Sequence, residues 1–98
     1  MAEIVWTEPA LNDFDLIAEY IAVSNLVAAK KLVKEVFAKV DILEEYPESG
    51  KSVSELPSLN YRELYVKPCR IFYKFEDSKV FILHVMRHEQ DLRRFLLD

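Results

Sequence analysis

Residues 61–94 read YRELYVKPCRIFYKFEDSKVFILHVMRHEQDLRR, and this stretch predicts three consecutive β-strands. Side chains alternate in character along residues 61–66 and again along 69–75, as they do on the two faces of a sheet. Residues 80–85 are almost wholly apolar, which is typical of a strand covered on both sides. Short turns at Lys67-Pro68 and at residues 76–78 separate the three strands. The stretch therefore predicts a small, mostly antiparallel sheet.

This alternation sorts the side chains of the predicted sheet onto two faces. One face of the second strand carries Cys69, Ile71, Tyr73 and Phe75, and the other carries Arg70, Phe72 and Lys74. In the preceding strand, Arg62, Leu64 and Val66 alternate with Tyr61, Glu63 and Tyr65. The side chains best suited to chemistry or to contacts with a partner are Arg62, Arg70, Arg87 and His88.

The residues before this sheet predict a short strand and a first helix. Residues 4–6 are apolar and suit a strand. Thr7 is a good N-cap, and Pro9 is tolerated in the first turn of a helix. Apolar residues then recur at helical spacing, with acidic residues largely off that stripe. We expect a helix over residues 8–23.

A second helix should follow at once. Ser24-Asn25 offers a turn and a second N-cap, and the helix should run to Tyr46 because Pro47 cannot continue it. Its apolar face is formed by Ala29, Leu32, Val33, Val36, Phe37, Val40 and Leu43. Two helices joined by so short a link form an antiparallel hairpin, and their apolar stripe needs a sheet to lie on.

Residues 47–60 predict a loop, since they hold the chain's only glycine, two of its four prolines and four serines. Such long loops tend to be functional or mobile. Residues 89–97 predict a short terminal helix. The predicted order is β-α-α-β-β-β-α: a single α+β domain over residues 1–98, with a helical hairpin packed on a small sheet.

Composition narrows the class of protein. Apolar residues make up 51% of the chain, which is ample for a core. Cys69 has no partner for a disulfide, and with two histidines it forms no zinc-ligand pattern. We therefore expect no cofactor and no metal. Because the sequence shows neither a signal peptide nor a membrane span, we expect a cytoplasmic protein with no membrane partner.

Charge is distributed unevenly along the chain. Residues 1–60 carry five Lys/Arg and eleven Asp/Glu, a net charge of −6. Residues 61–98 carry eight Lys/Arg and six Asp/Glu, a net charge of +2. A mildly basic C-terminal part is compatible with a polyanion site, but a dedicated nucleic-acid binder is usually far more basic.

Three local patterns carry a family resemblance. They are WTEPALNDFDLIAEYI (residues 6–21), EYPESGK (residues 45–51) and the sheet sequence of residues 61–92. In this order they resemble the RelE/ParE toxin superfamily of bacterial type II toxin–antitoxin systems, over essentially the whole chain. The resemblance implies a growth-arresting toxin, of the kind that stabilises plasmids, neutralised by a cognate antitoxin. RelE-like members cut mRNA on the ribosome, whereas ParE-like members poison DNA gyrase.

The resemblance also implies roles for the basic residues if the protein is a nuclease. Arg70 matches the strand arginine that binds the scissile phosphate, and the planar guanidinium suits that task. Arg62 falls near a family lysine, while Arg87 and His88 fall where a basic residue or histidine follows the last strand. Histidine is the residue type best suited to proton transfer near neutral pH, so His88 is the candidate acid or base.

Departures from the nuclease pattern favour gyrase inhibition over mRNA cleavage. Leu64 stands where a second family lysine is expected, and Phe95 stands near the place of a base-stacking tyrosine. The ending VMRHEQDL is partly similar to the end of ParE proteins. Two other interpretations stay open: Arg70 as a surface arginine paired with Glu63, and the chain as a decayed toxin that only binds its antitoxin.

The antitoxin, of RelB, ParD or Phd type, is the partner that the resemblance implies. An amphipathic helix or an added strand of the antitoxin would suit the exposed surfaces of this fold. For this contact we expect apolar anchors near the start of the second helix and lysines along it: Leu26, Val27, Lys30, Lys31 and Lys34.

Overall fold

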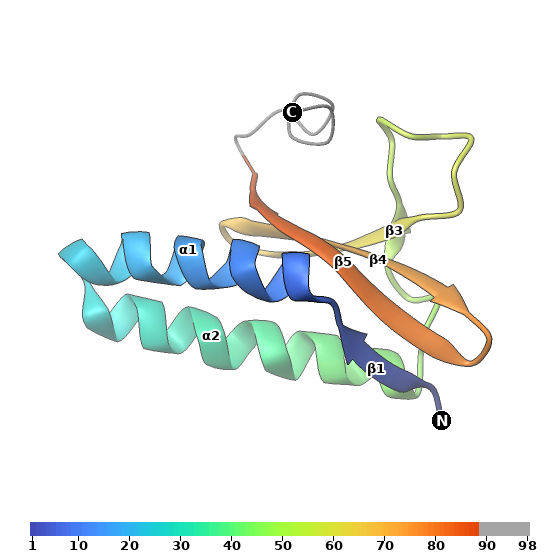
Figure 1. Cartoon of the computed structure of the whole chain (residues 1–98), viewed down its shortest axis with the longest axis horizontal. Helices are drawn as coiled ribbons and strands as arrows, with labels where there is room; N and C mark the ends of the chain where they lie inside the picture. Colours follow the sequence, from blue (N-terminus) through green and yellow to red (C-terminus); the bar gives the residue numbers. More distant parts are fainter. Residues whose placement is uncertain (89–98) are drawn as a thin grey trace.

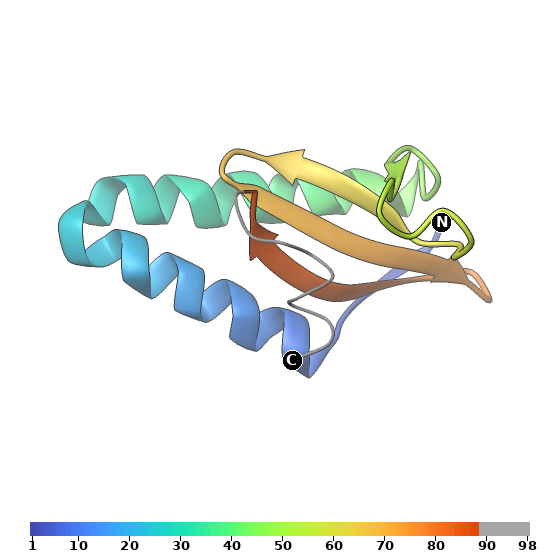
Figure 2. The ribbon, with the colours of Figure 1, turned by 90° about the horizontal axis from the view of Figure 1, so that it is seen from above.

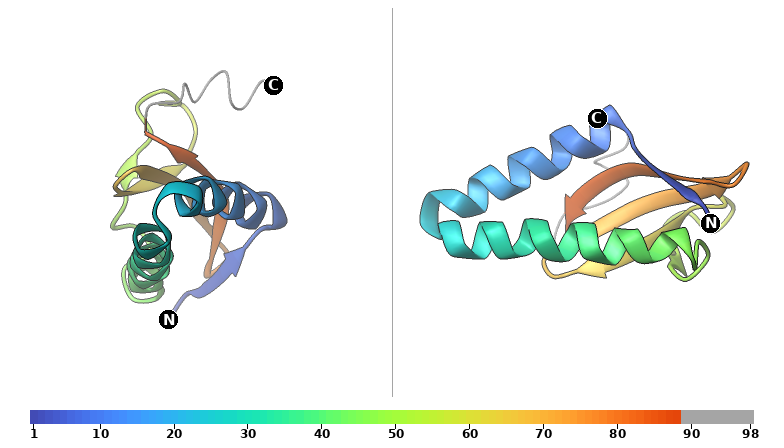
Figure 3. Two further views of the ribbon diagram at one scale, coloured as in Figure 1. Left: turned by 90° about the vertical axis from the view of Figure 1, so that its left-hand side faces the viewer. Right: turned by 90° about the horizontal axis from the view of Figure 1, so that it is seen from below.

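The computed structural model describes residues 1–88, in which a helical hairpin packs on one side of a five-stranded sheet (Figure 1). The elements are β1 (Glu3–Trp6), α1 (Glu8–Ser24), α2 (Leu26–Asp41), a 3₁₀ turn η1 (Ile42–Glu44), β2 (Lys51–Ser52), β3 (Arg62–Val66), β4 (Cys69–Glu76) and β5 (Lys79–Arg87). Figure 2 and Figure 3 show both helices running alongside the sheet. The predicted α+β class and hairpin are confirmed, and the helix predicted over residues 89–97 lies outside the described residues.

The sheet has the strand order β1-β5-β4-β3-β2. β1 runs parallel to β5, and the other neighbouring strands are antiparallel, as expected. β2 was not predicted. It lies within the loop of residues 47–60 and pairs Lys51 with Glu63 and Ser52 with Arg62. Two residues are too few to show strand periodicity, so sequence pattern cannot reveal such a strand.

Both helices begin where their caps predict. The Thr7 hydroxyl accepts a hydrogen bond from the Ala10 amide at 3.3 Å, and Asn25 Oδ1 accepts one from Ala28 at 3.0 Å. α2 ends at Asp41, short of the predicted Tyr46. The last turn tightens into η1, in which the Glu45 amide bonds to the Ile42 carbonyl at 3.2 Å. A 3₁₀ turn satisfies carbonyls at a helix end that have no α-helical partner.

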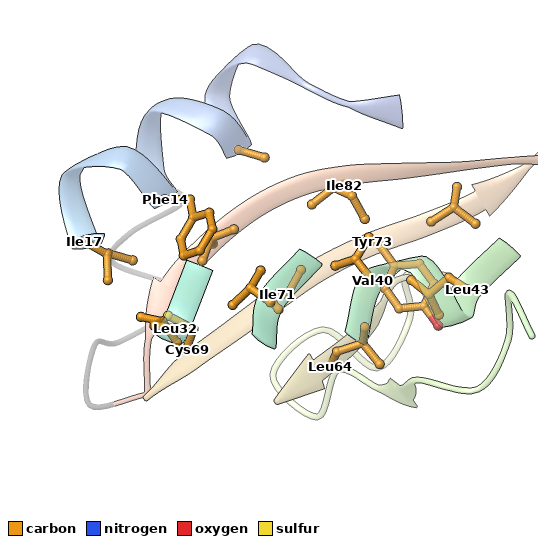
Figure 4. Packing of buried hydrophobic residues seen from close by; sticks show 14 residues of the cluster. Phe14, Ile17, Leu32, Val40, Leu43, Leu64, Cys69, Ile71, Tyr73 and Ile82 are labelled. Carbon is orange, nitrogen blue, oxygen red and sulfur yellow. The ribbon is translucent and has the colours of Figure 1, made fainter. Parts of the chain in front are cut away.

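The main core lies between the helices and one face of the sheet (Figure 4). Its members are Ala10, Phe14, Ile17, Leu32, Val36, Val40, Leu43, Leu64, Cys69, Ile71, Tyr73, Val80, Ile82 and Val85. Cys69 is fully buried among them, as a small apolar residue would be. A smaller cluster of Val53, Phe72 and Met86 lies on the opposite face, which we call the outer face.

A register shift in β5 decides which of its side chains face the helices. Phe72 of β4 pairs with His84, but the next residue, Tyr73, pairs with Ile82, so Leu83 is passed over. This bulge reverses the alternation along β5. Val85 and Arg87 consequently face the helices, while His84 and Met86 turn toward the outer face.

Helix α1 lies along the edge of β5 beyond the end of β1. β1 pairs with β5 only as far as Ile82. Beyond that point Asp13 Oδ2 accepts a hydrogen bond from the Val85 amide at 3.2 Å and lies 3.0 Å from His84 Nδ1. The partner of His84 therefore comes from a distant part of the chain, because α1 lies along this strand edge.

The only glycine occupies a place with no room for a side chain. The Gly50 amide donates to Tyr73 Oη at 2.9 Å, inside the main core. A Cβ atom built at Gly50 would lie 2.6 Å from that oxygen. Burial raises the pKa of Tyr73, so its hydroxyl stays protonated at neutral pH. The contact holds the chain that leaves α2 against the sheet.

Candidate functional site

Arg70 of β4 lies on the outer face and is held by two carboxylates. Its side chain is only 10% exposed. Nε and Nη2 donate to the two oxygens of Glu63 at 3.0 and 2.9 Å. Nη1 and Nη2 donate to the two oxygens of Glu55 at 2.8 and 2.9 Å. Four of the five N–H groups of the guanidinium are therefore engaged by carboxylate oxygens.

The strand register and a loop bring these three residues together. Arg70 pairs with Tyr65 and Phe72 pairs with Glu63, so Arg70 and Glu63 are diagonal neighbours on the same face. Glu55 comes from the loop between β2 and β3. The neighbouring Val53 is 1% exposed in the outer cluster. This apolar anchor fixes the loop on the sheet and presents Glu55 to Arg70.

The mutual hydrogen bonds of Arg70 and Glu55 favour the charged forms of both groups. The hydrogen bonds that Arg70 donates to Glu55, and then those to Glu63, raise the pKa of Arg70 above its ordinary value. The hydrogen bond from Arg70 lowers the pKa of Glu55 from 4.5 to about 2. One guanidinium and two carboxylates give the cluster a net charge of −1. The guanidinium carbon also lies 4.9 Å from the centre of the Phe72 ring, a cation–π contact.

A cavity of about 380 Å³ opens beside the cluster. It is lined by Lys51, Ser54, Glu55, Glu63, Tyr65, Arg70 and His88. His88 is exposed, and its ring meets the edge of Tyr65 with ring centres 5.3 Å apart. Arg70 and His88, two of the predicted nuclease residues, thus border one cavity.

The other two predicted nuclease residues lie on the opposite, helix-facing side of the sheet. Arg62 pairs with the core residue Tyr73, and its Nη1 donates to the Gly50 carbonyl at 2.8 Å. Arg87 pairs with Cys69, and its guanidinium carbon lies 4.9 Å from the centre of the Tyr20 ring on α1. The sheet therefore separates Arg62 and Arg87 from Arg70 and His88.

Glu55 is the residue of this site that sequence reasoning missed. Glu63 had been considered as a partner of Arg70, but the loop carboxylate had not. The available signal was its position between two apolar residues of the loop, Val53 and Leu56. Apolar residues in a loop pack against the fold and fix the polar residue between them.

The helical hairpin bears a second concave surface. A groove of about 340 Å³ is lined by Ala18, Glu19, Ala22, Leu26, Ala29, Lys30 and Val33. Leu26 and Val27 are 57% and 78% exposed. Lys31 borders a different cavity of about 300 Å³, together with Lys67 of the β3–β4 turn. Lys34 is exposed on the same helix.

The described residues offer no metal centre and no membrane span. Within residues 1–88, no three His, Cys, Asp or Glu side chains lie close enough together to hold a metal ion. None of the helices in that part of the chain is both long and apolar enough to cross a membrane.

Comparisons with known proteins agree on one class. A family model described as ParE toxin of type II toxin-antitoxin system, parDE, matches residues 4–92. Toxin RelE2 of Caulobacter vibrioides is 36% identical over 89 residues, which cover 90% of this chain and 96% of that protein. A solved structure, the chromosomal ParDE TA system from P. aeruginosa, matches with a TM-score of 0.77 and 25% identity, covering 91% of this chain and 98% of that one.

The fold and these matches define a toxin of a type II toxin–antitoxin system. The chain belongs to the ParE toxin family, within the RelE/ParE superfamily. Membership of such a system implies an antitoxin as partner.

Glu55→Gln should make the free energy of unfolding less dependent on pH in the acidic range. The folded protein holds the pKa of Glu55 at about 2, below its ordinary 4.5. Because the folded pKa is depressed, the stabilisation from Glu55 is present above about pH 4.5 and is lost as pH falls toward about 2. Urea unfolding across this range measures the effect. The difference in free energy of unfolding between the wild type and the variant should shrink as pH falls toward about 2. A difference that does not change with pH would contradict the ion pair between Glu55 and Arg70.

Proposed function

We propose that this toxin arrests growth by inhibiting DNA gyrase, in the cytoplasm, and does not cut mRNA. The observation that carries the proposal is the state of Arg70, whose guanidinium is held by Glu55 and Glu63. Membership of the ParE family supports the same target.

Phosphodiester cleavage makes demands that this arrangement does not meet. A scissile phosphate needs a free guanidinium edge, and negative charge builds up on its oxygens during the reaction. Both paired edges of Arg70 are occupied by carboxylates, and a cluster with a net charge of −1 repels phosphate. Arg62 and Arg87 are on the other side of the sheet and do not converge on the same phosphate.

One observation favours the alternative, a ribosome-dependent mRNA endoribonuclease. Arg70 and His88 border the same cavity, so a phosphate bound there would lie near a group suited to proton transfer. This activity requires Glu55 to leave the guanidinium. Arg70 would then act as phosphate clamp and His88 as acid or base.

The two activities are separated by testing purified toxin on both targets. We expect the toxin to inhibit supercoiling of relaxed plasmid by purified gyrase, and the inhibition to disappear when antitoxin is added first. Primer extension on mRNA translated in a reconstituted system should show no toxin-dependent cuts. Cleavage within codons, without gyrase inhibition, would contradict the proposal. Loss of that cleavage in His88→Ala would then support the alternative.

We propose further that the antitoxin binds the groove between α1 and α2. Leu26 and Lys30 line this groove directly. The proposed contact surface also includes Val27 and Lys34, which are exposed on α2, and Lys31, which borders the separate cavity near Lys67. An amphipathic antitoxin helix with acidic flanks is complementary to this surface in both hydrophobicity and charge.

Charge reversal tests this surface. Lys30→Glu together with Lys34→Glu should weaken antitoxin binding by at least about tenfold, since like charges would then face each other. Lys39→Glu is the control for a charge reversal on the same helix, at a residue that does not line the groove. Isothermal titration with the purified antitoxin measures both. Equal affinities for the double variant and the control would rule out this surface.

A further inference from the structure

The two carboxylates that hold Arg70 differ in how firmly they are built into the fold. Glu63 belongs to β3, pairs in register with Phe72, and has a side chain only 4% exposed. Glu55 belongs to a loop, and its side chain is 29% exposed at the wall of the cavity. Release of Glu63 would leave a buried carboxylate without its partner, which is costly. Release of Glu55 gives up two hydrogen bonds from Arg70, but its carboxylate turns into water and does not stay buried.

We propose that Glu55 is an internal, displaceable ligand, and that the cavity beside Arg70 is an oxyanion site which Glu55 keeps closed. In the open state the Nη1 and Nη2 edge of Arg70 binds a carboxylate or a phosphate supplied by another molecule, while Glu63 keeps its hold on the other edge. This inference concerns a binding site and does not depend on whether gyrase is the target.

The geometry of the closed state specifies the ligand. Glu55 presents two oxygens to Nη1 and Nη2 at 2.8 and 2.9 Å, so the site accepts a flat, bidentate pair of oxygens. A carboxylate and two oxygens of a phosphate both satisfy this geometry. With Glu55 turned away, Arg70 and Glu63 together are neutral, and Lys51 and His88 border the cavity as additional donors. The open site is thus no longer repulsive to an anion.

Glu55 acts as a competitor tethered to the site. An intramolecular ligand on a short loop competes as though it were present at millimolar or higher concentration. A free anion therefore binds weakly to the wild type. Only a ligand that also contacts neighbouring groups, such as the exposed rings of Tyr65 and His88, displaces the loop carboxylate with high affinity.

Removal of the competitor provides the test. Inorganic phosphate and acetate are titrated separately into the wild type and Glu55→Ala, and the Arg70 Nε–H resonance is followed by NMR. The variant should bind at least one of the two anions about tenfold or more tightly than the wild type does. Glu48→Ala is the matched control, since Glu48 is an exposed carboxylate 3.7 Å from Arg62 on the other face. Glu48→Ala should bind phosphate and acetate with the same affinity as the wild type.

A second variant keeps the test decisive if Glu55→Ala does not fold. Glu55→Gln retains the side-chain length but loses the charge, so its anion affinity should lie above that of the wild type. Tighter binding of phosphate than of acetate points to a phosphate-bearing ligand, and the reverse order points to a carboxylate side chain or chain terminus. Wild-type affinity for both anions in every folded Glu55 variant overturns the proposal. That result would leave the gyrase assay untouched.

Discussion

A β-strand places successive side chains on opposite faces, and in this toxin the helical hairpin covers one face of the sheet. The apolar residues of α1 and α2 are buried against side chains of β3, β4 and β5, among them Leu64, Ile71 and Ile82. The same alternation sends Arg70 to the outer face. The bulge that passes over Leu83 then sends Arg87 back to the helix side. The packing of the helices on the sheet, together with the bulge, therefore determines on which face each of these arginines lies.

On the outer face, the cluster of Arg70, Glu55 and Glu63 stabilises the packing of the loop on the sheet. The hydrophobic cluster there is small, consisting of Val53, Phe72 and Met86 with their neighbours. The ion pairs of Arg70 add directional contacts that hold the loop and β3 together. A buried arginine deprived of both carboxylates would cost more than the pair itself contributes, so the buried Glu63 stays paired with Arg70. While Glu55 also holds the guanidinium, Arg70 is poorly placed to bind a substrate phosphate.

The fold could be predicted from the sequence because the long helices and strands have clear periodic patterns of apolar residues. The caps at Thr7 and Asn25 and the alternation of β3 and β4 are local features, and local features can be read from a single chain. The bulge at Leu83, the two-residue β2 and the reach of Glu55 across to Arg70 depend on tertiary contacts between distant segments. These features determine which charges meet. For this reason the family could be predicted, whereas the grouping of Arg62, Arg70, Arg87 and His88 into one site could not be tested without the structure.

A double-mutant cycle between Arg70 and Glu63 tests most directly whether Arg70 is held by its carboxylates. Arg70→Met should lower the free energy of unfolding by about 3–5 kcal/mol, because it leaves the buried Glu63 carboxylate without its partner. Glu63→Leu should lower it by less, because Arg70 keeps its hydrogen bonds to Glu55. The double variant replaces the pair with apolar side chains, so it should lose less than the sum of the single losses, with a coupling of about 2 kcal/mol or more. Additive losses, with a coupling below about 0.5 kcal/mol, would contradict this account.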